Sequence, residues 1–450
     1  MTTQTTDITT APEEKLDIKK ILPVFVIVLI DLLGLTIIIP LLPLYAASFG
    51  ANAFVIGALG AAYPIMQFIG APILGRLSDR FGRRPVLIIS QIGTFIGFLV
   101  LGVANTLWLL FISRIIDGIS GANIATAQAV ISDSTTEKTR TQGLGLIGAA
   151  FGLGFIVGPI IAFVTLALSD NNYSLVAYVA ATFSLFSILL TYFWLEETHP
   201  PEKRGGGDQS PSFGFKALFD ALRKPEIGFL LALMFAQQFA FGGFEQLLAL
   251  FTLNRLGMNA SSNAGLFVYV GIIVVMVQGY FVGKWSRKKG DRWLVMMGLL
   301  VIGIGLLISA ITPKNPVPWY SKAEITAELS AGTNLPGETP PVQDIQIDLP
   351  DDNNNGWLGL TWLLVAMIPI SIGGGVLQPS INSMITQQVS PEEVGGTLGI
   401  SAAFLSGSNA ITPLIMGAIF EWFGSTAPFL IGGIILLILW AIANRTIARE

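Results

Sequence analysis

The stretch GRLSDRFGRRP, residues 75–85, carries five charges and lies between two long apolar runs. A second stretch, GKWSRKKGDR at residues 283–292, has nearly the same pattern. Three small residues recur with a fixed separation of 208 positions: Gly75, Ser78 and Gly82 correspond to Gly283, Ser286 and Gly290. The same charged turn therefore occurs twice, which indicates an internal repeat.

The apolar runs on both sides of these turns are long enough to cross a bilayer. The chain has 450 residues, of which 52% are apolar and 12% charged, whereas soluble proteins carry roughly 25% charged residues. Runs of about 20 apolar residues suffice for a spanning helix, and twelve occur. They lie near 21–47, 54–74, 85–104, 107–131, 141–167, 174–195, 226–253, 263–283, 292–312, 357–380, 394–420 and 426–444. We expect an all-α membrane protein of twelve transmembrane helices in two pseudo-symmetric six-helix bundles.

The distribution of basic residues predicts how the chain lies in the membrane. The first run follows a polar tail, residues 1–20, that lacks the features of a cleaved signal peptide. Almost all of the 25 Lys and Arg residues fall in this tail and in alternate loops; the opposite side holds only Arg255, Lys314 and Lys322. The positive-inside rule then places both termini in the cytoplasm of a multi-pass cell-membrane protein.

The repeat continues through the later helices. Gly145 and Pro159 match Gly399 and Pro413 with a separation of 254, and the increase is accounted for by a polar segment at residues 313–355. Parallel repeats are typical of transporters, because two similar bundles can rock about a central site. The expected units are a cytoplasmic tail (1–20), an N-terminal bundle (21–199), a cytoplasmic linker (200–225), and a C-terminal bundle (226–450) with an extracytoplasmic insertion (313–355).

The linker is rich in Gly, Pro and charged residues, which favours flexibility. Four apolar residues near its end, Phe215, Leu218, Phe219 and Leu222, share one face of a helix. This pattern predicts a short amphipathic helix on the cytoplasmic surface, with a plain linker as the alternative.

The longest motif, GRLSDRFGRRPVL at residues 75–87, resembles the loop motif of the major facilitator superfamily, specifically its twelve-helix drug:proton antiporters such as tetracycline efflux proteins. The resemblance covers nearly the whole chain. It implies a conformational latch formed by Gly75, Asp79, Arg80, Gly82 and Arg83. In the family the acidic residue also meets the start of helix eleven, and here that helix has strong start signals at Ser390, Pro391 and Glu393.

Three further motifs resemble the same family. Helix one carries DLLGLTIIIPLLPLY from Asp31, and helix four carries RIIDGISGA from Arg114. Helix five carries GLGFIVGPIIAF, which resembles the antiporter motif at Gly154, Gly158 and Pro159. Small residues four apart also form a close helix seam, so simple packing remains open for helix five.

Four ionisable residues lie deep within the predicted helices: Asp31, Arg114, Asp117 and Glu245. Each costs about 3 kcal/mol or more in hydrocarbon, so we expect them to face an ion partner or a water-filled cavity. Arg114 and Asp117, three apart, can form a local pair. Alternatively, Asp31 joins them, so that one arginine is shared by two acids and one carboxyl exchanges protons as the bundles rock. This second arrangement predicts proton coupling.

Other polar residues on the helices are candidates for binding a solute. Glu245, Gln238 and Phe235 share much of one face of helix seven, which suits an amphipathic or cationic compound. Hydration of Glu245 near the outer interface is the alternative. Further candidates are Tyr63, Gln67, Gln128, Gln378 and Asn382, for which helix-to-helix hydrogen bonds are equally consistent.

The remaining features exclude several functions. The chain has no cysteine, and no nucleophile constellation, metal cluster or phosphate loop is recognised, so we expect neither an enzyme nor a cofactor nor a nucleic-acid partner. DDNNNG at residues 351–356 resembles the start of a calcium loop but lacks its final Glu. We expect a monomeric secondary transporter that exports amphipathic small molecules in exchange for protons. A lipid or metabolite carrier and a non-transporting membrane sensor are the alternatives.

Overall fold

The computed structural model describes residues 17–200, 202, 215–224, 227–331, 347–389 and 394–446. Regular structure in these ranges is helical. The first half contains α1 (Ile18–Ile38), α2 (Leu42–Ser48), α3 (Ala53–Phe81), α4 (Arg83–Gly102), α5 (Leu107–Ser120), α6 (Asn123–Asp133), α7 (Glu137–Leu168) and α8 (Tyr173–Trp194). The second contains α10 (Gly228–Leu256), α11 (Ala260–Met276), η3 (Val277–Phe281), α12 (Val282–Lys289), α13 (Asp291–Ala310), α14 (Lys322–Ala331), η4 (Asp352–Asn354), α15 (Leu358–Gln387), α16 (Val394–Phe423) and α17 (Ala427–Thr446). The expected all-helical fold is confirmed.

Twelve long helical segments account for the predicted spans. Eleven segments of the described chain are long and apolar enough to cross a membrane; among them, α1 with α2 and α5 with α6 each form one interrupted span. The twelfth is α10, which has 29 residues. Its two polar pairs, Gln237–Gln238 and Glu245–Gln246, lower its hydropathy. The long helix that falls short in hydropathy is therefore the one that carries Glu245, which is half-buried.

The two charged turns are more helical than predicted. Residues 75–81 form the last two turns of α3, and residues 283–289 belong to α12, so only Gly82 and Gly290 remain as turns. Both glycines have positive φ, 102° and 83°, and each donates its N–H to the serine carbonyl four residues earlier. A helix can extend beyond the bilayer because charged side chains there meet water, and a glycine in this conformation ends it without strain.

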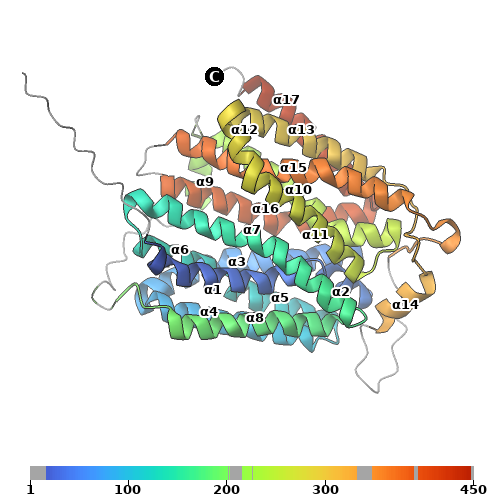
Figure 1. The fold of residues 1–450 in the computed structure, drawn as a ribbon, viewed down its shortest axis with the longest axis horizontal. Coiled ribbons are helices and arrows are strands. Elements are labelled where there is room, and N and C mark those ends of the chain that lie inside the picture. Colours follow the sequence, from blue (N-terminus) through green and yellow to red (C-terminus); the bar gives the residue numbers. More distant parts are fainter. Residues whose placement is uncertain are drawn as a thin grey trace, which may run out of the picture.

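The chain folds as two bundles (Figure 1), the first from α1 to α8 and the second from α10 to α17. In the first, α1 packs on α7 and α8, and α4 packs on α5 and α8; in the second, α13 packs on α15 and α17, and α10 packs on α16. Equivalent contacts also recur. Arg83 Nε lies 3.0 Å from Asp133 Oδ2, and Asp291 Oδ2 accepts a hydrogen bond from Gln387, which lies 254 positions after Asp133.

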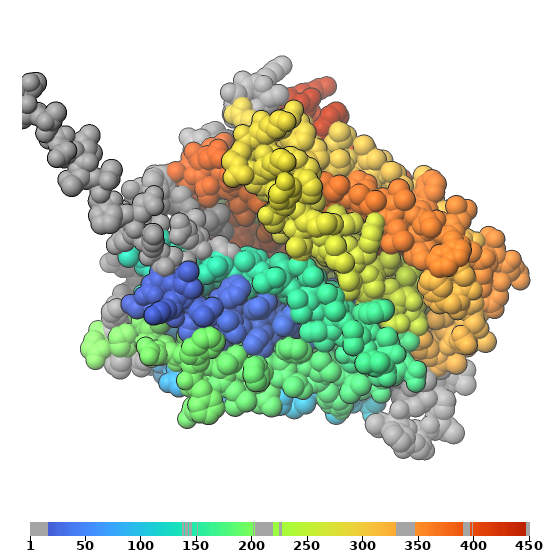
Figure 2. Space-filling model, viewed as in Figure 1, coloured from blue at the N-terminus to red at the C-terminus, as the bar shows by residue number. Residues whose placement is uncertain are grey.

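The bundles meet along two helix pairs, α3 with α16 and α7 with α11. A Cβ on Gly57 would lie 2.2 Å from the Pro413 carbonyl oxygen, so these backbones touch. Toward α12 the bundles separate: a Cβ on Gly75 or Gly283 would have no neighbour within 4 Å. Figure 2 shows a recess between the halves on that side. We call the end of the molecule near α9 (Phe215–Leu222) the linker end, and the opposite end, near α14, the insertion end.

The polar segment between α13 and α15 is packed against the second bundle where it is described. Tyr320 Oη donates to the Pro350 carbonyl at 2.7 Å, and Val317 donates its N–H to Leu256 at 3.0 Å. The DDNNNG stretch forms η4, and Asp351 pairs with Lys322. The segment is therefore a folded cap in its described parts. Most of the predicted linker, and Ser390, Pro391 and Glu393 at the predicted latch, lie outside the described residues.

Candidate functional site

The centre of the first bundle is built around a break in one membrane span. α5 ends at Ser120 and α6 begins at Asn123, so Gly121 and Ala122 interrupt the helix. Small residues here allow close packing: a Cβ on Gly118 would lie 2.5 Å from the Tyr63 carbonyl oxygen, and one on Gly121 would lie 2.5 Å from Tyr63 Oη. Gln67 donates to the Gly121 carbonyl at 3.0 Å, which holds the break against α3.

A buried ion pair lies one turn before this break. Arg114 Nη1 is 3.0 Å from Asp117 Oδ2, and both residues are 1% exposed. The Arg114 guanidinium also lies 5.7 Å from the centre of the Phe98 ring, and its Nε donates to Ser113 Oγ at 3.2 Å. Nη2 has no hydrogen-bond partner in the described chain, and the Asp117 contact lacks hydrogen-bond geometry. The pair is therefore neutral overall but incompletely bonded.

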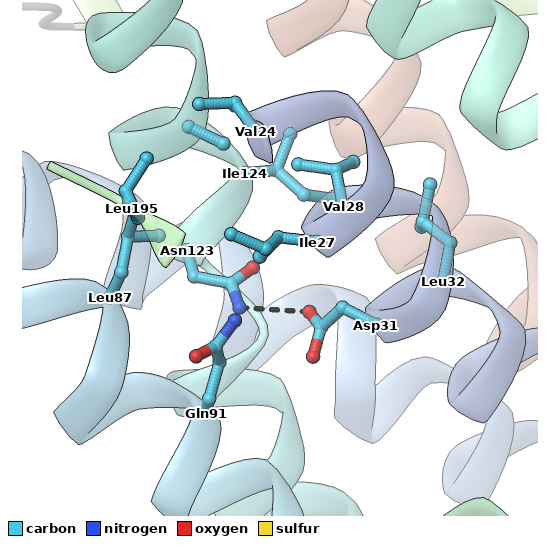
Figure 3. A pocket seen from close by; sticks show the side chains of 11 residues that line it. Val24, Ile27, Val28, Asp31, Leu32, Leu87, Gln91, Asn123, Ile124 and Leu195 are labelled. Carbon is cyan, nitrogen blue, oxygen red and sulfur yellow. Dashed lines mark hydrogen bonds between the residues drawn. The ribbon is translucent and has the colours of Figure 1, made fainter. Parts of the chain in front are cut away.

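Asp31 lies in a small pocket beside the break rather than against Arg114. Its Oδ2 accepts a 2.8 Å hydrogen bond from Asn123 Nδ2, at the first residue of α6 (Figure 3). Its Oδ1 is buried and has no partner among the described residues. The pocket brings together residues of α1, α4, α6 and the end of α8: Val24, Ile27, Val28, Asp31, Leu32, Leu87, Gln91, Asn123, Ile124, Ala127 and Leu195. Asp31 is thus a carboxyl in an apolar pocket with one free oxygen.

The second bundle contributes an amide-rich face on α10 and α16. Gln238 Nε2 donates to Asn409 Oδ1 at 2.8 Å, and the Phe235 carbonyl accepts from Ser408 Oγ at 3.1 Å. Glu245, two turns further along α10, is half-buried. No hydrogen bond or ion pair of Glu245 is found within the described parts of the chain. Glu245 is therefore a partly buried acid without a charge partner among the described residues.

The other predicted contact residues differ in their environments. Tyr63 and Gln67 are half-buried and hydrogen-bonded to each other at 3.3 Å. Gln128 on α6 and Gln378 on α15 are exposed. The structure therefore uses Tyr63 and Gln67 mainly in helix packing, and leaves Gln128 and Gln378 accessible.

The helix-five motif forms the contact between α7 and α1. Thr36 Oγ1 lies 2.9 Å from the Gly154 carbonyl oxygen and 2.8 Å from that of Leu32. A Cβ on Gly158 would lie 2.1 Å from Thr36 Oγ1, so no larger residue fits without separating the helices. Pro159 lies inside α7. The motif sets how closely α7 packs against the helix that carries Asp31.

The predicted latch residues at the linker end form a network within the first bundle. Arg83 donates to Asp79 Oδ1 at 2.5 Å, Ser78 Oγ at 2.7 Å and Asp133 Oδ2 at 3.0 Å. Glu197 accepts the N–H of Arg83 at 2.9 Å and so caps α4. Arg80 stacks on Phe81. A Cβ on Gly75 would have no neighbour within 4 Å, so Gly75 makes no close helix contact in this arrangement.

Asn123, Thr36 and Asn409 are the main polar residues of the site that sequence reasoning missed. Asn123 follows the small residues Ser-Gly-Ala. This run could have been used to predict a break in the helix, where backbone amides are exposed. Thr36 and Asn409 carry no comparable signal, because a single polar residue in an apolar helix does not reveal which neighbour it faces.

The sequence of the chain is similar to that of known membrane transporters. The family model described as Major Facilitator Superfamily matches residues 24–348 and 355–448. The chain is 27% identical to the class B tetracycline resistance protein of Escherichia coli, over 88% of this chain and 87% of that protein. It is 26% identical to multidrug resistance protein 1 of Bacillus subtilis, over 87% of each.

A solved structure shares the fold. The human organic anion transporter MFSD10 superposes with a TM-score of 0.65 at 22% identity, covering 96% of this chain and 100% of that one. At this identity the likeness concerns the fold alone. Together with the match over most of the sequence, the two bundles show that the chain belongs to the Major Facilitator Superfamily of membrane transporters.

Proposed function

We propose that the protein is a proton-coupled antiporter that exports amphipathic small molecules by alternating access. The observation that carries this proposal is Asp31, a carboxyl at mid-helix with one oxygen bound to Asn123 and the other without a partner in the described chain. An ionised carboxylate in such surroundings is costly, whereas the protonated carboxyl costs much less. A group in this position is suited to bind and release a proton when its surroundings change.

The buried pair supports a connection between proton and conformation. Asn123, the partner of Asp31, and Asp117, the partner of Arg114, lie on either side of the break at Gly121–Ala122. A small change of angle at this break would alter the distance between Asn123 and Asp31 and the exposure of the free oxygen. We infer that rocking of the bundles changes the proton affinity of Asp31 through this break.

The orientation follows from the charge distribution. With both termini in the cytoplasm, the linker end faces the cytoplasm and the recess opens toward it. The protein acts as a monomer with two halves, residues 21–199 and 226–450. Because the recess between them opens to the cytoplasm, the solute enters from that side. Export from the cytoplasm is consistent with the names of two relatives, a tetracycline resistance protein and a multidrug resistance protein.

Glu245 gives the proposal its substrate class. It is a carboxylate without a charge partner in the described residues, on a helix that also carries Gln238 and Phe235. An amphipathic cation can supply the missing charge and place its apolar part against aromatic rings. We therefore assign amphipathic cations as the preferred solutes.

Replacement of Glu245 by Gln is expected to weaken binding of an amphipathic cation by about ten-fold or more, because a hydrogen bond to a charged group is worth about 1.5–3 kcal/mol. Binding of a neutral analogue of the same shape should change less than two-fold. Equilibrium binding to purified protein measures both. The matched control adds Gln246→Glu to the Glu245→Gln variant, so that the carboxylate stands one position later, next to α3. This control should not restore binding of the cation. Equal retention of both ligands by Glu245→Gln would contradict the assignment.

Flux in reconstituted vesicles tests the function itself. Uptake of an amphipathic cationic dye should follow an imposed pH gradient and collapse with a protonophore. Absence of any flux would indicate a non-transporting protein, and flux of lipids or polar metabolites instead would indicate the alternative carriers.

A further inference from the structure

α14 joins the two bundles at the insertion end. It lies in the cap between α13 and α15, and so belongs to the second bundle by sequence, yet it packs on α2 of the first. Its apolar residues Ile325 and Leu329 are buried in the same core cluster as Leu44 and Tyr45 of α2. In Figure 1, α14 lies beyond the α2 end of the bundles. Any separation of the bundles at this end must break this contact.

The cap itself is fixed to the second bundle. Asn254 of α10 donates to the Asp348 carbonyl at 2.8 Å, and Leu256 of α10 accepts the N–H of Val317 at 3.0 Å, while Lys314 pairs with Asp348 at 2.8 Å within the cap. A Cβ on Gly257, which has a φ of 63°, would lie 2.0 Å from the Tyr320 ring. The cap therefore moves with the second bundle, and α14 contacts the first bundle as a fixed arm.

Glu328 on α14 lies where three loops meet. Its Oε2 accepts a 3.3 Å hydrogen bond from Asn259, which caps α11, and the side chain of Asn171 in the α7–α8 turn lies close enough to lower the pKa of the Glu328 carboxyl. Asn171 also accepts the N–H of Ser261 at 3.0 Å, which joins the first bundle to the first turn of α11. Asn171 is held with a φ of 58°. Glu328 thus lies between Asn259 of the second bundle, which donates to it, and Asn171 of the first bundle, which is near its carboxyl.

A second contact between the bundles lies at the equivalent position of the other helix pair. Glu421 near the end of α16 accepts the N–H of Ala53, the first residue of α3, at 2.9 Å. Ser261 lies 208 positions after Ala53, so the same turn is used twice. The insertion end is closed by two such junctions, and only the one formed by Asn171 is covered by the cap.

We propose that α14 is a clasp that holds the insertion end closed by joining both bundles through Glu328, and that protonation of Glu328 tightens it. The inference rests on alternating access from the proposed function, but not on Asp31 or on the identity of the solute. A proton that arrives from the insertion side would then close that side and favour the arrangement open at the linker end.

The surroundings of Glu328 support the proton dependence. Burial raises the pKa of Glu328 from 4.5 to about 7, and the amides of Asn259 and Asn171 oppose this shift only in part. Among titratable groups, Tyr173 on α8 interacts with Glu328 and contacts the ring of Tyr45 on α2. Asp170 precedes Asn171 in the chain, and Lys322 and Glu324 lie earlier on α14. Lys322 pairs with Asp351, and no ion pair of Glu328 occurs within the described residues. An ionised Glu328 is therefore disfavoured while the clasp is closed.

The sign of the pH effect follows from linkage. A carboxyl whose pKa is raised in the closed form binds its proton more tightly there, so protonation stabilises the closed form. This stabilisation is complete below about pH 4.5 and is lost as the pH rises through about 7. Between pH 6 and pH 8 the ratio of open to closed molecules should therefore rise about ten-fold.

Spin-label distances across the insertion end test the clasp. The chain has no cysteine, so Leu168→Cys and Ile311→Cys, which replace residues 83% and 63% exposed at the ends of α7 and α13, give one label on each bundle. Wild type should gain a longer distance from pH 6 to pH 8. Glu328→Gln and Glu328→Leu, which cannot ionise, should keep the short distance at both pH values.

The matched control is Glu324→Gln, an exposed carboxyl one turn earlier on α14, which should respond to pH like wild type. A pH-independent wild type, or a Glu328→Gln variant with the full wild-type response, would overturn the clasp. Neither result bears on solute export, since the distances are measured without transport. Loss of transport with an intact distance response would instead count against the proposed function alone.

Discussion

Replacement of Asp31 by Asn is expected to reduce transport driven by a pH gradient by about 100-fold or more, the lower range of what a positioned proton-transfer group contributes. Asn cannot carry a proton, yet it keeps the size of the side chain and can still bond to Asn123. Solute exchange at equal pH on both sides should therefore remain. Uptake of a labelled solute into vesicles, with and without a pH gradient, measures both activities.

Two control variants sharpen this experiment. Asp348→Asn removes an exposed carboxyl that pairs with Lys314 on the cap, and should leave gradient-driven uptake within about two-fold, as for surface substitutions generally. Asn123→Ala retains the carboxyl of Asp31 but removes its hydrogen bond, so it should shift the pH dependence without abolishing uptake. Gradient-driven uptake that survives in Asp31→Asn would contradict the assignment of Asp31 as the proton carrier.

Replacement of Asp117 by Asn is expected to lower the free energy of unfolding by about 3–5 kcal/mol, because it leaves the charge of Arg114 buried without a counterion. Both side chains are 2% exposed, so water cannot compensate for the lost carboxylate. Denaturant unfolding followed by the fluorescence of the nine tryptophans measures the change.

The double variant Arg114→Met with Asp117→Leu separates structure from function. Replacement of a buried pair by apolar residues of similar size is often neutral, so the double variant should recover most of the stability lost by Asp117→Asn. It should not recover gradient-driven transport if the pair sets the geometry of the break at Gly121. If Asp117→Asn unfolds at the same denaturant concentration as wild type, Asp117 is not the counterion of Arg114.

The fold was largely predictable because it depends on patterns that extend over many residues. The hydropathy of the chain predicted the membrane-spanning helices. The internal repeat was predicted from matching residues 208 positions apart, such as Gly82 and Gly290. The helix ends were less accurate, since α3 continues to Phe81, well past the apolar run. Charged residues beyond the bilayer do not stop a helix, so hydropathy marks where the membrane ends rather than where the helix does.

The site was predictable in its residue types but not in its pairings. The energetic cost of charge in hydrocarbon identified Asp31, Arg114, Asp117 and Glu245. Spacing indicated the Arg114–Asp117 pair as one of two possible arrangements, the other being an arginine shared with Asp31. Spacing could not indicate that Asp31 bonds to Asn123, because that contact depends on a helix break and on how α1 packs against α6. The role of α14 was equally hidden, since Glu328 acquires its partners from the distant turns at Asn171 and Asn259.

The most direct test of the account is the internal pH of vesicles that contain the protein while an amphipathic cation enters them. Antiport requires protons to leave as the solute enters, so the interior should become more alkaline, in proportion to solute uptake, with wild-type protein and not with Asp31→Asn. Solute entry at constant internal pH, or equal alkalinisation by the variant, would contradict proton exchange through Asp31.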